Sequence, residues 1–419
     1  MTMATDSPRD GFRLSMLIYD SRYRALTIQL FVLALFIAVI WWLGSNLQNN
    51  LAEKGRPLSF DFLWSRAGYD IAQTLIPYTN DSTHFRAMLV GLVNTLVLAF
   101  FGCIFATIIG VIVGVLRLSK NWLIARLMTI YVEIFRNIPL LLWILLIFVP
   151  LGEMTPGPNA FRLTDEMVAS GTLPAASMLF GETVAITNRG TYIPGFLFDR
   201  GFESGWLTTL VILAVILGSL FVHFTLTARA RRVQEDTGVR PTTWWKSLAV
   251  LFLPLAALLW AMGFHLDIPQ PPTRFNFEGG VLLQNAFVAM LVALSLYTGA
   301  FIAEIVRAGI LAVSRGQTEA AYALGLRPNR TMRLVVLPQA LRVIIPPLIS
   351  QFLNLTKNTS LGIAASYADL RGTLGGVTLN QTGREVEAML LMMLIYLSIS
   401  LSISALMNVY NRSVQLKER

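Results

Sequence analysis

The sequence AMLVGLVNTLVLAFFGCIFATIIGVIVGVL, residues 87–116, contains no Asp, Glu, Lys or Arg. The hydrocarbon core of a lipid bilayer is about 30 Å thick, and an α-helix needs roughly 20 mostly apolar residues to cross it. This run of 30 residues is therefore predicted to be a membrane-spanning helix. Ala106, Gly110 and Gly114 recur within it every four residues, a spacing of small side chains that allows helices to pack closely in lipid.

Seven further apolar stretches accompany this run. Five of them contain at least 20 residues without charge, and these are 25–52, 204–228, 247–266, 279–303 and 388–411. Two shorter stretches, 137–152 and 343–356, adjoin charged residues in otherwise apolar surroundings. Buried core helices of a soluble protein are the alternative, but they do not account for six charge-free runs long enough to span a bilayer. We therefore predict an all-α integral membrane protein with about eight transmembrane helices.

The composition of the 419 residues excludes several other classes of protein. Charged residues make up 14% of the chain, against roughly 25% in soluble domains, and a disordered chain would be less apolar. Cys103 has no second cysteine to pair with, which excludes a disulfide framework. The histidines His84, His223 and His265 are scattered, so no metal site is predicted. The sequence has no P-loop and no local pattern of nucleophile and base, so no catalytic residue is predicted.

The distribution of Lys and Arg predicts the orientation of the helices. Eight spans place both termini on one side, and cytoplasmic segments carry the excess of Lys and Arg. With both termini inside, the inner segments hold 21 of these residues and the outer segments hold 10; the inner segments are 1–24, 117–126, 229–246, 307–342 and 412–419. We therefore predict a multi-pass plasma-membrane protein with both termini in the cytoplasm. The net charge of +9 then indicates topology rather than nucleic-acid binding.

One polar segment on the predicted cytoplasmic side, SRGQTEAAYALGLRPNRTMRLVVLPQALR at 314–342, carries most of the functional information. Ser314 opens a capping-box pattern that predicts the start of a short helix, and Gly325 is placed to end it. A second short helix is predicted over 330–337, ending before Pro338. By spacing alone, the segment is either a compact knob that another protein approaches closely or an ordinary interfacial loop.

This segment resembles the EAA loop of ABC-transporter inner-membrane permeases. The resemblance is carried by Glu319-Ala320-Ala321, by Gly325, and by Leu337-Pro338 after Val335, where Ile is usual. Five motifs resemble the subfamily that imports polar amino acids, namely GQTEAA at 316–321, LPQALRVIIPP at 337–347, AEIVRAGI at 303–310, EIFRNIPL at 133–140 and KNTSL at 357–361. The resemblance covers about 85–150 and 284–409. Asn358 stands where an acidic residue is common and Trp143 where Gln is common, which leaves the substrate open.

The resemblance implies a five-helix core of the type I ABC importer permease kind, made of 87–116, 127–150, 279–307, 343–356 and 388–411. It implies the transmembrane permease subunit of an ATP-driven, binding-protein-dependent amino-acid uptake system, without catalysis of its own. This chain would bind no cofactor, because ATP and Mg²⁺ would be held by a partner ATPase. The ATPase-coupling residues would be Gly316, Glu319, Ala320, Ala321, Gly325, Leu337 and Pro338.

The same resemblance implies the partners. They are a cytoplasmic ABC ATPase dimer, a second related permease in a heterodimer, a periplasmic amino-acid-binding protein and the lipid of a bacterial inner membrane, with no nucleic acid. The chain is longer than the five-helix core, so we expect the core to comprise 85–150 and 284–419, the second part including the coupling loop 314–342. Residues 1–84 would add a tail, a helix and a periplasmic loop, and residues 151–283 would add a periplasmic loop and two helices.

Polar residues mark the apolar run 343–356 and the residues that follow it. Pro347, Gln351, Asn354 and Asn358 fall on one helical face, and Pro346-Pro347 are predicted to interrupt the helix. Broken, polar-lined helices are where transporters often hold substrate. The predicted substrate-path residues are Gln351, Asn354, Lys357, Asn358, Thr359 and Glu304. The alternative is that the amides only bond to neighbouring helices.

Two further pairs of charged residues lie within apolar surroundings. Glu133 and Arg136, and likewise Glu304 and Arg307, are three residues apart, the spacing of an ion pair within a helix. We predict that Glu133, Arg136 and Arg307 form ion pairs or gate contacts. An ion-coupled secondary amino-acid transporter is the alternative function, and it would need intramembrane acids without partners, for which only Glu133 and Glu304 qualify. A membrane enzyme is a third function, against which the missing nucleophile counts.

Overall fold

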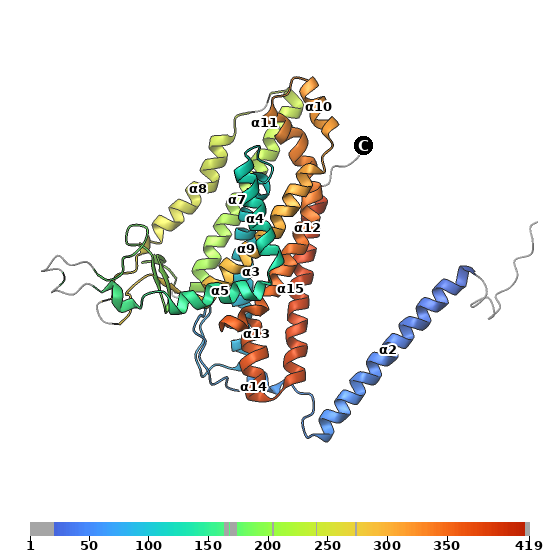
Figure 1. The fold of residues 1–419 in the computed structure, drawn as a ribbon, viewed down its shortest axis with the longest axis vertical. Helices are drawn as coiled ribbons and strands as arrows, with labels where there is room; N and C mark the ends of the chain where they lie inside the picture. The colour runs from blue at the N-terminus through green and yellow to red at the C-terminus, as the bar shows by residue number, and fades with distance from the viewer. Residues whose placement is uncertain are drawn as a thin grey trace, which may run out of the picture.

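The computed structural model describes residues 21–162, 167, 174–202, 205–239, 241–272 and 275–414. Residues 1–20 and 415–419, which belong to the predicted cytoplasmic tails, lie outside the described residues. Most helices run side by side along the long axis of the molecule (Figure 1). The described helices include seven that are long and apolar enough to cross a membrane, and an eighth span if one bent pair is counted as a span. The prediction of about eight spans is confirmed.

The core of the bundle is built around α9 (Asn285–Leu311), which packs against α3 (His84–Leu116), α12 (Leu337–Asn358) and α5 (Leu140–Glu153). Its centre is a cluster of buried apolar side chains that includes Leu98, Leu294, Ile302 and Leu355. α15 (Glu385–Val414) packs against α12. The core therefore lies inside the predicted five-helix unit, as the resemblance implies.

The contacts of three glycines show the directions of the core helices. Gly110 of α3 lies against Ile302 of α9, and Gly114 lies against Val306. These residues advance together along the chain, so α3 and α9 run in the same direction. Gly309, near the end of α9, instead lies against Ile344, near the start of α12. Helix α12 therefore runs in the opposite direction to α9, as an alternating path through a membrane requires.

The small residues of α3 form the seam with α9. A Cβ atom added at Gly110 would lie 2.5 Å from the Cβ of Ile302, and one added at Gly114 would lie 2.7 Å from the carbonyl oxygen of Ala303. Ala106 is fully buried in the same seam. The prediction that these residues allow close helix packing is confirmed, because any larger side chain would separate the two backbones.

The predicted span over 127–150 is not a single helix. It consists of α4 (Trp122–Asn137) and α5, which meet at an angle of 102°. The break lies at Ile138, whose backbone is extended at φ −100° and ψ 134°, directly before Pro139. The ring of a proline disfavours the helical conformation in the residue before it, so the expectation of one straight helix was wrong at this point.

Two predictions about proline in the fourth core helix were also wrong. The second short helix does not end before Pro338, because α11 (Pro328–Thr331), the π-helix η3 (Met332–Val336) and α12 follow one another without a break. The wider turn of η3 lets Leu337 donate to the carbonyl of Met332 five residues back. Pro338 follows this wide turn directly; it has no N–H to donate, but its ring holds φ near the helical value, so the helix continues through it.

Pro346 and Pro347 do not interrupt α12 either. The φ angle that a proline ring imposes is close to the helical value, so the helix loses two hydrogen bonds but keeps its course. Ile344 and Ile345, directly before the two prolines, are buried against the core and hold this part of the helix in place. Packing between helices thus outweighs the local cost of the prolines.

After α12 the chain forms a series of short helices, η4 (Thr359–Ala365), α13 (Leu370–Gly372), η5 (Thr373–Thr378) and α14 (Leu379–Thr382). α13 and α14 lie at the end of the molecule away from α10 and α11 (Figure 1). Gly91 of α3 permits the close approach of the residue that caps α13, since a Cβ there would lie 2.7 Å from the carbonyl oxygen of Asp369. The buried Thr95 accepts a hydrogen bond from the backbone N–H of Leu370 at 3.0 Å.

The N-terminal extension contributes α2 (Ser21–Glu53) and the short helix η1 (Asp61–Trp64). Helix α2 leaves the bundle at an angle and is exposed along most of its length (Figure 1). The segment that follows it docks on the start of α15, where Arg384 donates to the carbonyl of Pro57 at 2.6 Å. Phe62 and Leu63 are buried in a cluster with residues of α3, α13, η5 and α15.

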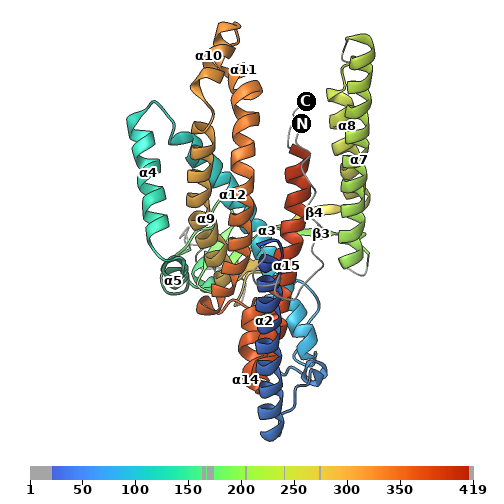
Figure 2. The same ribbon diagram turned by 90° about the vertical axis from the view of Figure 1, so that its right-hand side faces the viewer.

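The insert between the two parts of the core contains the two predicted helices and some strands. α7 (Gly205–Thr237) and α8 (Trp244–Ala261) pack on each other, and Figure 2 shows this pair and α4 on opposite sides of the core helices. The strands form two small antiparallel sheets that the sequence analysis missed. They are β1 (Ala185–Thr187), β2 (Gly190–Ile193) and β5 (Val281–Leu283) in one sheet, and β3 (Gly195–Phe198) and β4 (Phe264–Asp267) in the other, with η2 (Pro158–Phe161) beside them.

Candidate functional site

The segment 314–342 begins with a compact knob, formed by α10 (Arg315–Ala323) and α11. Ser314 is the residue before α10, as predicted, but its side chain makes no capping hydrogen bond. The knob turns at Gly325, which has φ +75°, a value that glycine adopts without strain. Gly325 N–H donates to the carbonyl of Tyr322 at 2.9 Å and Leu326 N–H to that of Ala321 at 3.1 Å. This pair of bonds is the Schellman motif, so Gly325 ends the helix as predicted.

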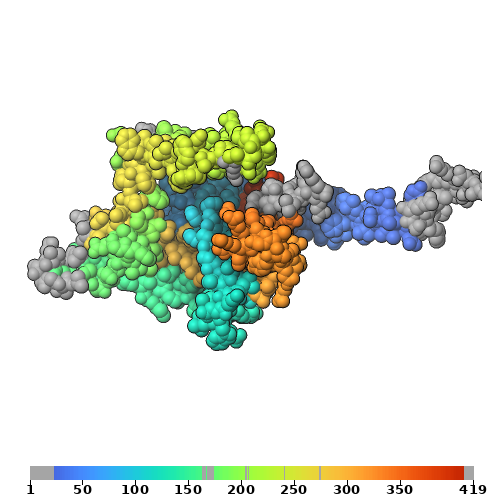
Figure 3. Space-filling view, turned by 90° about the horizontal axis from the view of Figure 1, so that it is seen from above, coloured from blue at the N-terminus to red at the C-terminus, as the bar shows by residue number. Residues whose placement is uncertain are grey.

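The knob protrudes from one end of the molecule. Figure 3 looks onto this end, where the orange knob lies uncovered beside α4. Five of the seven predicted coupling residues lie within the knob, and Leu337 and Pro338 lie at the start of α12. Gly316, Glu319, Ala320 and Gly325 are exposed. Ala321 is only 4% exposed and faces the inside of the knob, so its small side chain serves internal packing.

One exposed apolar residue of the knob was missed by the sequence analysis. Leu324, directly before Gly325, is 82% exposed, and Tyr322 is 47% exposed. These two side chains add exposed apolar surface to an otherwise polar loop. The sequence feature that could have revealed this residue is a leucine at the turn of an otherwise polar segment.

The predicted substrate-path residues of α12 form one exposed strip along the helix. Asn354 and Lys357 are exposed, and Gln351 and Asn358 are partly exposed. Their side chains make no hydrogen bond within the described part of the chain, so the amides do not serve to bond neighbouring helices of this chain. Thr359 differs, because it is fully buried and its hydroxyl donates to the carbonyl of Thr356 at 2.8 Å.

Glu304 of α9 is the centre of an ionic cluster that joins three helices. It accepts from Arg307 at 3.1 Å, which confirms the predicted pair within α9. It also accepts from Arg117, at the end of α3, at 2.5 Å. Arg136 of α4 reaches the same carboxylate at 3.6 Å. The sequence analysis missed Arg117, whose only signal was its position directly after the apolar run.

The predicted ion pair between Glu133 and Arg136 is not formed. Arg136 instead faces Glu304 and lies 5.4 Å from the centre of the Phe301 ring. Glu133 accepts a hydrogen bond from the side chain of Asn137 at 3.3 Å. Attraction to a partner on another helix therefore prevailed over the spacing within α4. Because Glu304 is already paired, it does not supply the free intramembrane acid that an ion-coupled transporter would need.

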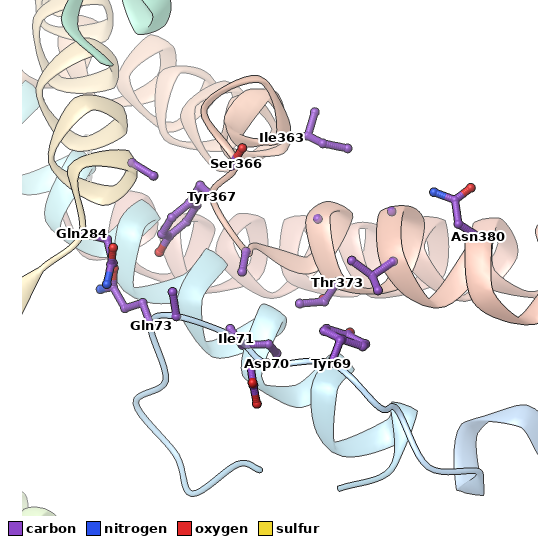
Figure 4. A pocket seen from close by; sticks show the side chains of 16 residues that line it. Tyr69, Asp70, Ile71, Gln73, Gln284, Ile363, Ser366, Tyr367, Thr373 and Asn380 are labelled. Carbon is purple, nitrogen blue, oxygen red and sulfur yellow. The ribbon is translucent and has the colours of Figure 1, made fainter. Parts of the chain in front are cut away.

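A pocket of about 450 Å³ lies near the other end of the molecule, between the loop 69–73, the start of α9 and the segment 363–380. Asn94, fully buried on α3, joins two of its walls by donating to the carbonyls of Gln73 at 3.0 Å and Ala368 at 2.9 Å. In Figure 4 the side chains of Gln73 and Gln284 lie beside each other at one end, while the carboxylate of Asp70 points away from the ring of Tyr367.

The carboxyl group next to this pocket is electrostatically unusual. Asp369 is fully buried, and burial raises the pKa of its carboxyl group to about 6. The N–H of Gly372 at 2.7 Å and the hydroxyl of Tyr396 at 3.2 Å donate to it and offset part of this increase. The group holds α13 in place by capping its start, and it does not line the pocket.

Comparison with known proteins identifies the family of the chain. Residues 241–416 match the family described as "Binding-protein-dependent transport system inner membrane component". The chain is 64% identical over 427 residues, covering 100% of both chains, to the "Glutamate/glutamine/aspartate/asparagine transport system permease protein BztB" of Rhodobacter capsulatus. It is 41% identical to the "General L-amino acid transport system permease protein AapQ" of Rhizobium johnstonii, over 98% of this chain and 96% of that protein.

A third relative, the "Putative amino-acid ABC transporter permease protein YhdX" of Escherichia coli K12, is 41% identical over 98% of this chain and 99% of its own length. The similarity to all three relatives extends over nearly the whole chain, so it includes the extension and the insert as well as the core. The chain therefore belongs to the inner-membrane permeases of binding-protein-dependent ABC transport systems.

Proposed function

We propose that this chain is the membrane-spanning subunit of an ATP-driven amino-acid uptake system and that its knob transmits the motion of a cytoplasmic ATPase. Permeases of this family work with an ATPase and a binding protein. All three relatives are named for amino-acid transport, which supports amino acids as the substrates. The observation that carries the proposal is the uncovered knob, in which Glu319 and Ala320 lie exposed and Leu324 is 82% exposed.

A continuous helical stretch joins the base of this knob to the predicted substrate-path residues, which supports the proposal. α10 packs against α11 and η3, which continue without a break into α12. α11 and η3, on which α10 packs, thus form one end of a helical stretch whose other end contains Asn354 and Lys357. A force on the knob would move this stretch as one body, because backbone hydrogen bonds between successive turns resist changes in its backbone dihedral angles. The polar strip would then change its position relative to the neighbouring permease.

The proposal includes the expected partners. The polar strip of α12, with Gln351, Asn354, Lys357 and Asn358, would face a second related permease, and together the two chains would enclose the path. Lys357 would attract negative charge into the path, since a charge within the membrane segment is stabilised by a counterion. ATP and Mg²⁺ would be bound by the partner ATPase, and this chain would carry out no catalysis. Both termini would lie in the cytoplasm of a bacterial cell.

The decisive experiment uses the complete complex in proteoliposomes, with ATPase, second permease and binding protein. Leu324→Asp and Gly325→Pro should leave assembly intact but reduce ATP-driven amino-acid uptake by about tenfold or more, since losing a buried apolar contact costs roughly 1.5–3 kcal/mol. Val239→Asp is the matched control, because Val239 is a 72% exposed apolar residue on another predicted cytoplasmic segment. Normal uptake by both knob variants would refute the coupling role.

A second measurement tests the path. Alanine variants of Gln351, Asn354 and Lys357 should change the affinity or rate of uptake while ATPase binding stays normal. If uptake affinity and rate are unchanged in all three variants, the strip is not part of the path. Uptake that persists without ATP and follows an imposed ion gradient would instead establish the ion-coupled alternative.

A further inference from the structure

The ionic cluster around Glu304 contains more positive charge than its carboxylate can balance. Arg117, Arg136 and Arg307 bring three positive charges to one negative charge, so the net charge is +2. Each guanidinium has five N–H donors, whereas a carboxylate accepts about four hydrogen bonds. Hydrogen bonds to Glu304 use one donor each from Arg117 and Arg307. The cluster is therefore rich in donors and complementary to a further oxyanion.

The burial of the three arginines shows which of them can meet such an oxyanion. The side chain of Arg117 is only 7% exposed, and its Nε atom is buried without a partner in the described part of the chain. The side chains of Arg136 and Arg307 are each 36% exposed. Arg136 also has the longest distance to Glu304, at 3.6 Å. It is accessible and is the least firmly paired member of the cluster.

The contacts between helices, rather than the length of α4, show where the guanidinium of Arg136 lies. α4 begins at Trp122, shortly after the end of α3, and runs along the bundle beside the core (Figure 2). Arg136 is near the end of α4, but its guanidinium shares the carboxylate of Glu304 with Arg117, the residue directly after α3. Charged side chains on such helices face a cavity, a path or a polar surface rather than hydrocarbon, because a charge in hydrocarbon is costly. Because Arg117 directly follows the apolar run of α3, a lipid phosphate at that surface is the competing oxyanion.

The neighbouring face of α9 continues the site toward the other side of the membrane. Tyr297, Phe301 and Glu304 are spaced by four and three residues, so they lie on one face, and all three are partly exposed. The rings of Tyr297 and Phe301 are 5.1 Å apart, and Arg136 lies over Phe301 at 5.4 Å. Aromatic faces attract ammonium groups, and a guanidinium pairs with a carboxylate. The site thus offers a complement to both charged groups of an amino acid.

We infer that Arg136, positioned by Glu304, binds the α-carboxylate of the amino acid during its passage through the permease. The inference deepens the proposed function and rests on it. It explains how one permease would accept amino acids with different side chains, since the α-carboxylate is common to all of them. Glu304 acts as a positioning residue, because it holds the guanidinium of Arg136 without needing to touch the substrate.

The test measures equilibrium binding to the full permease–ATPase complex in lipid nanodiscs, without the binding protein. The probes are L-glutamine and L-glutaminamide, in which an amide replaces the α-carboxylate. The wild-type complex should bind L-glutamine and lose about tenfold or more in affinity for L-glutaminamide, as expected for a charge-assisted hydrogen bond. Arg136→Gln should weaken L-glutamine binding to the same extent and abolish the discrimination between the two probes. Arg136→Lys should restore part of it.

Arg126→Gln is the matched control, because Arg126 lies exposed on the same helix and outside the cluster. It should leave both affinities unchanged. Equal wild-type affinity for the two probes would overturn the inference, and this comparison needs no variant to fold. Unchanged L-glutamine binding by Arg136→Gln, together with loss of phosphatidylglycerol binding in this variant, would overturn the inference in favour of a lipid phosphate. ATP-driven uptake that continues in either case would leave the proposed function standing.

Discussion

Replacing Gly110 by alanine tests the seam on which the core depends. The added Cβ would lie 2.5 Å from the Cβ and Cγ2 atoms of Ile302 and 2.9 Å from the carbonyl oxygen of Gly299. Carbon atoms in contact are normally about 3.5–4.0 Å apart, so α3 and α9 must separate by roughly 1 Å. The β-branched Ile302 has little rotamer freedom with which to avoid the contact.

The magnitude follows from two opposing effects. Inserting a methyl group into a well-packed core costs about 1–3 kcal/mol, and the stiff neighbours place this site in the upper half of the range. Alanine gains back at most about 1 kcal/mol over glycine through its higher helix propensity. We therefore expect Gly110→Ala to lower the free energy of unfolding by about 1–2 kcal/mol.

The assay is the fraction of monodisperse protein on size-exclusion chromatography after heating in detergent. Gly44→Ala in α2 and Gly218→Ala in α7 are the controls, because an added Cβ meets no atom within 4 Å at either position. Both controls should melt at or slightly above the wild-type temperature, and Gly110→Ala several degrees below it. A Gly110→Ala protein that melts together with the controls would refute the close-packed seam.

Three further predictions concern charges and the knob. Glu304→Gln leaves the 7% exposed Arg117 without its carboxylate and should destabilise the protein by about 1–3 kcal/mol, whereas Glu133→Gln should have no effect in the same melting assay. Because the native pKa of Asp369 is about 6 rather than 3.8, the native state binds one proton more than the unfolded chain between these values. Stability should therefore fall as the pH rises from about 4 to 6 and then level off, and Asp369→Asn should remove this slope; an identical slope in the variant contradicts the assignment. Gly325→Ala places a side chain at φ +75° and should cost the knob about 1 kcal/mol, measured as slower ATP-driven uptake by the assembled complex; Gly218→Ala, where an added Cβ meets no atom within 4 Å, should leave uptake unchanged.

The apolar runs were readable from the sequence because hydrocarbon thickness imposes a length on every span. The run 87–116 corresponds to α3, and the run 388–411 lies within α15. The knob was readable as well, since Gly325 has a conformational reason to end α10. The predictions about where proline interrupts a helix failed. A sharp bend lies at Pro139, where a single helix was predicted, while Pro338, Pro346 and Pro347 do not break the helix.

The ionic cluster shows why the candidate site was only partly predictable. The spacing of Glu304 and Arg307 predicts their ion pair, because both lie on one helix. Arg117 and Arg136 contact Glu304 because of the way α3 and α4 pack against α9. No pattern of neighbouring residues in the sequence predicts this packing. Likewise, the burial of Ala321 follows from the packing of the knob on η3.

The sequence by itself determined that this chain crosses the membrane about eight times, that a polar knob interrupts the spans, and which family the knob resembles. These properties depend on composition and on spacing along one helix, which act within a few residues. The tertiary structure decided which arginines share Glu304, which face of α12 stays uncovered, and that α11, η3 and α12 connect the knob to that face. Such properties arise from contacts between segments far apart in the chain, where packing and charge outweigh local preference.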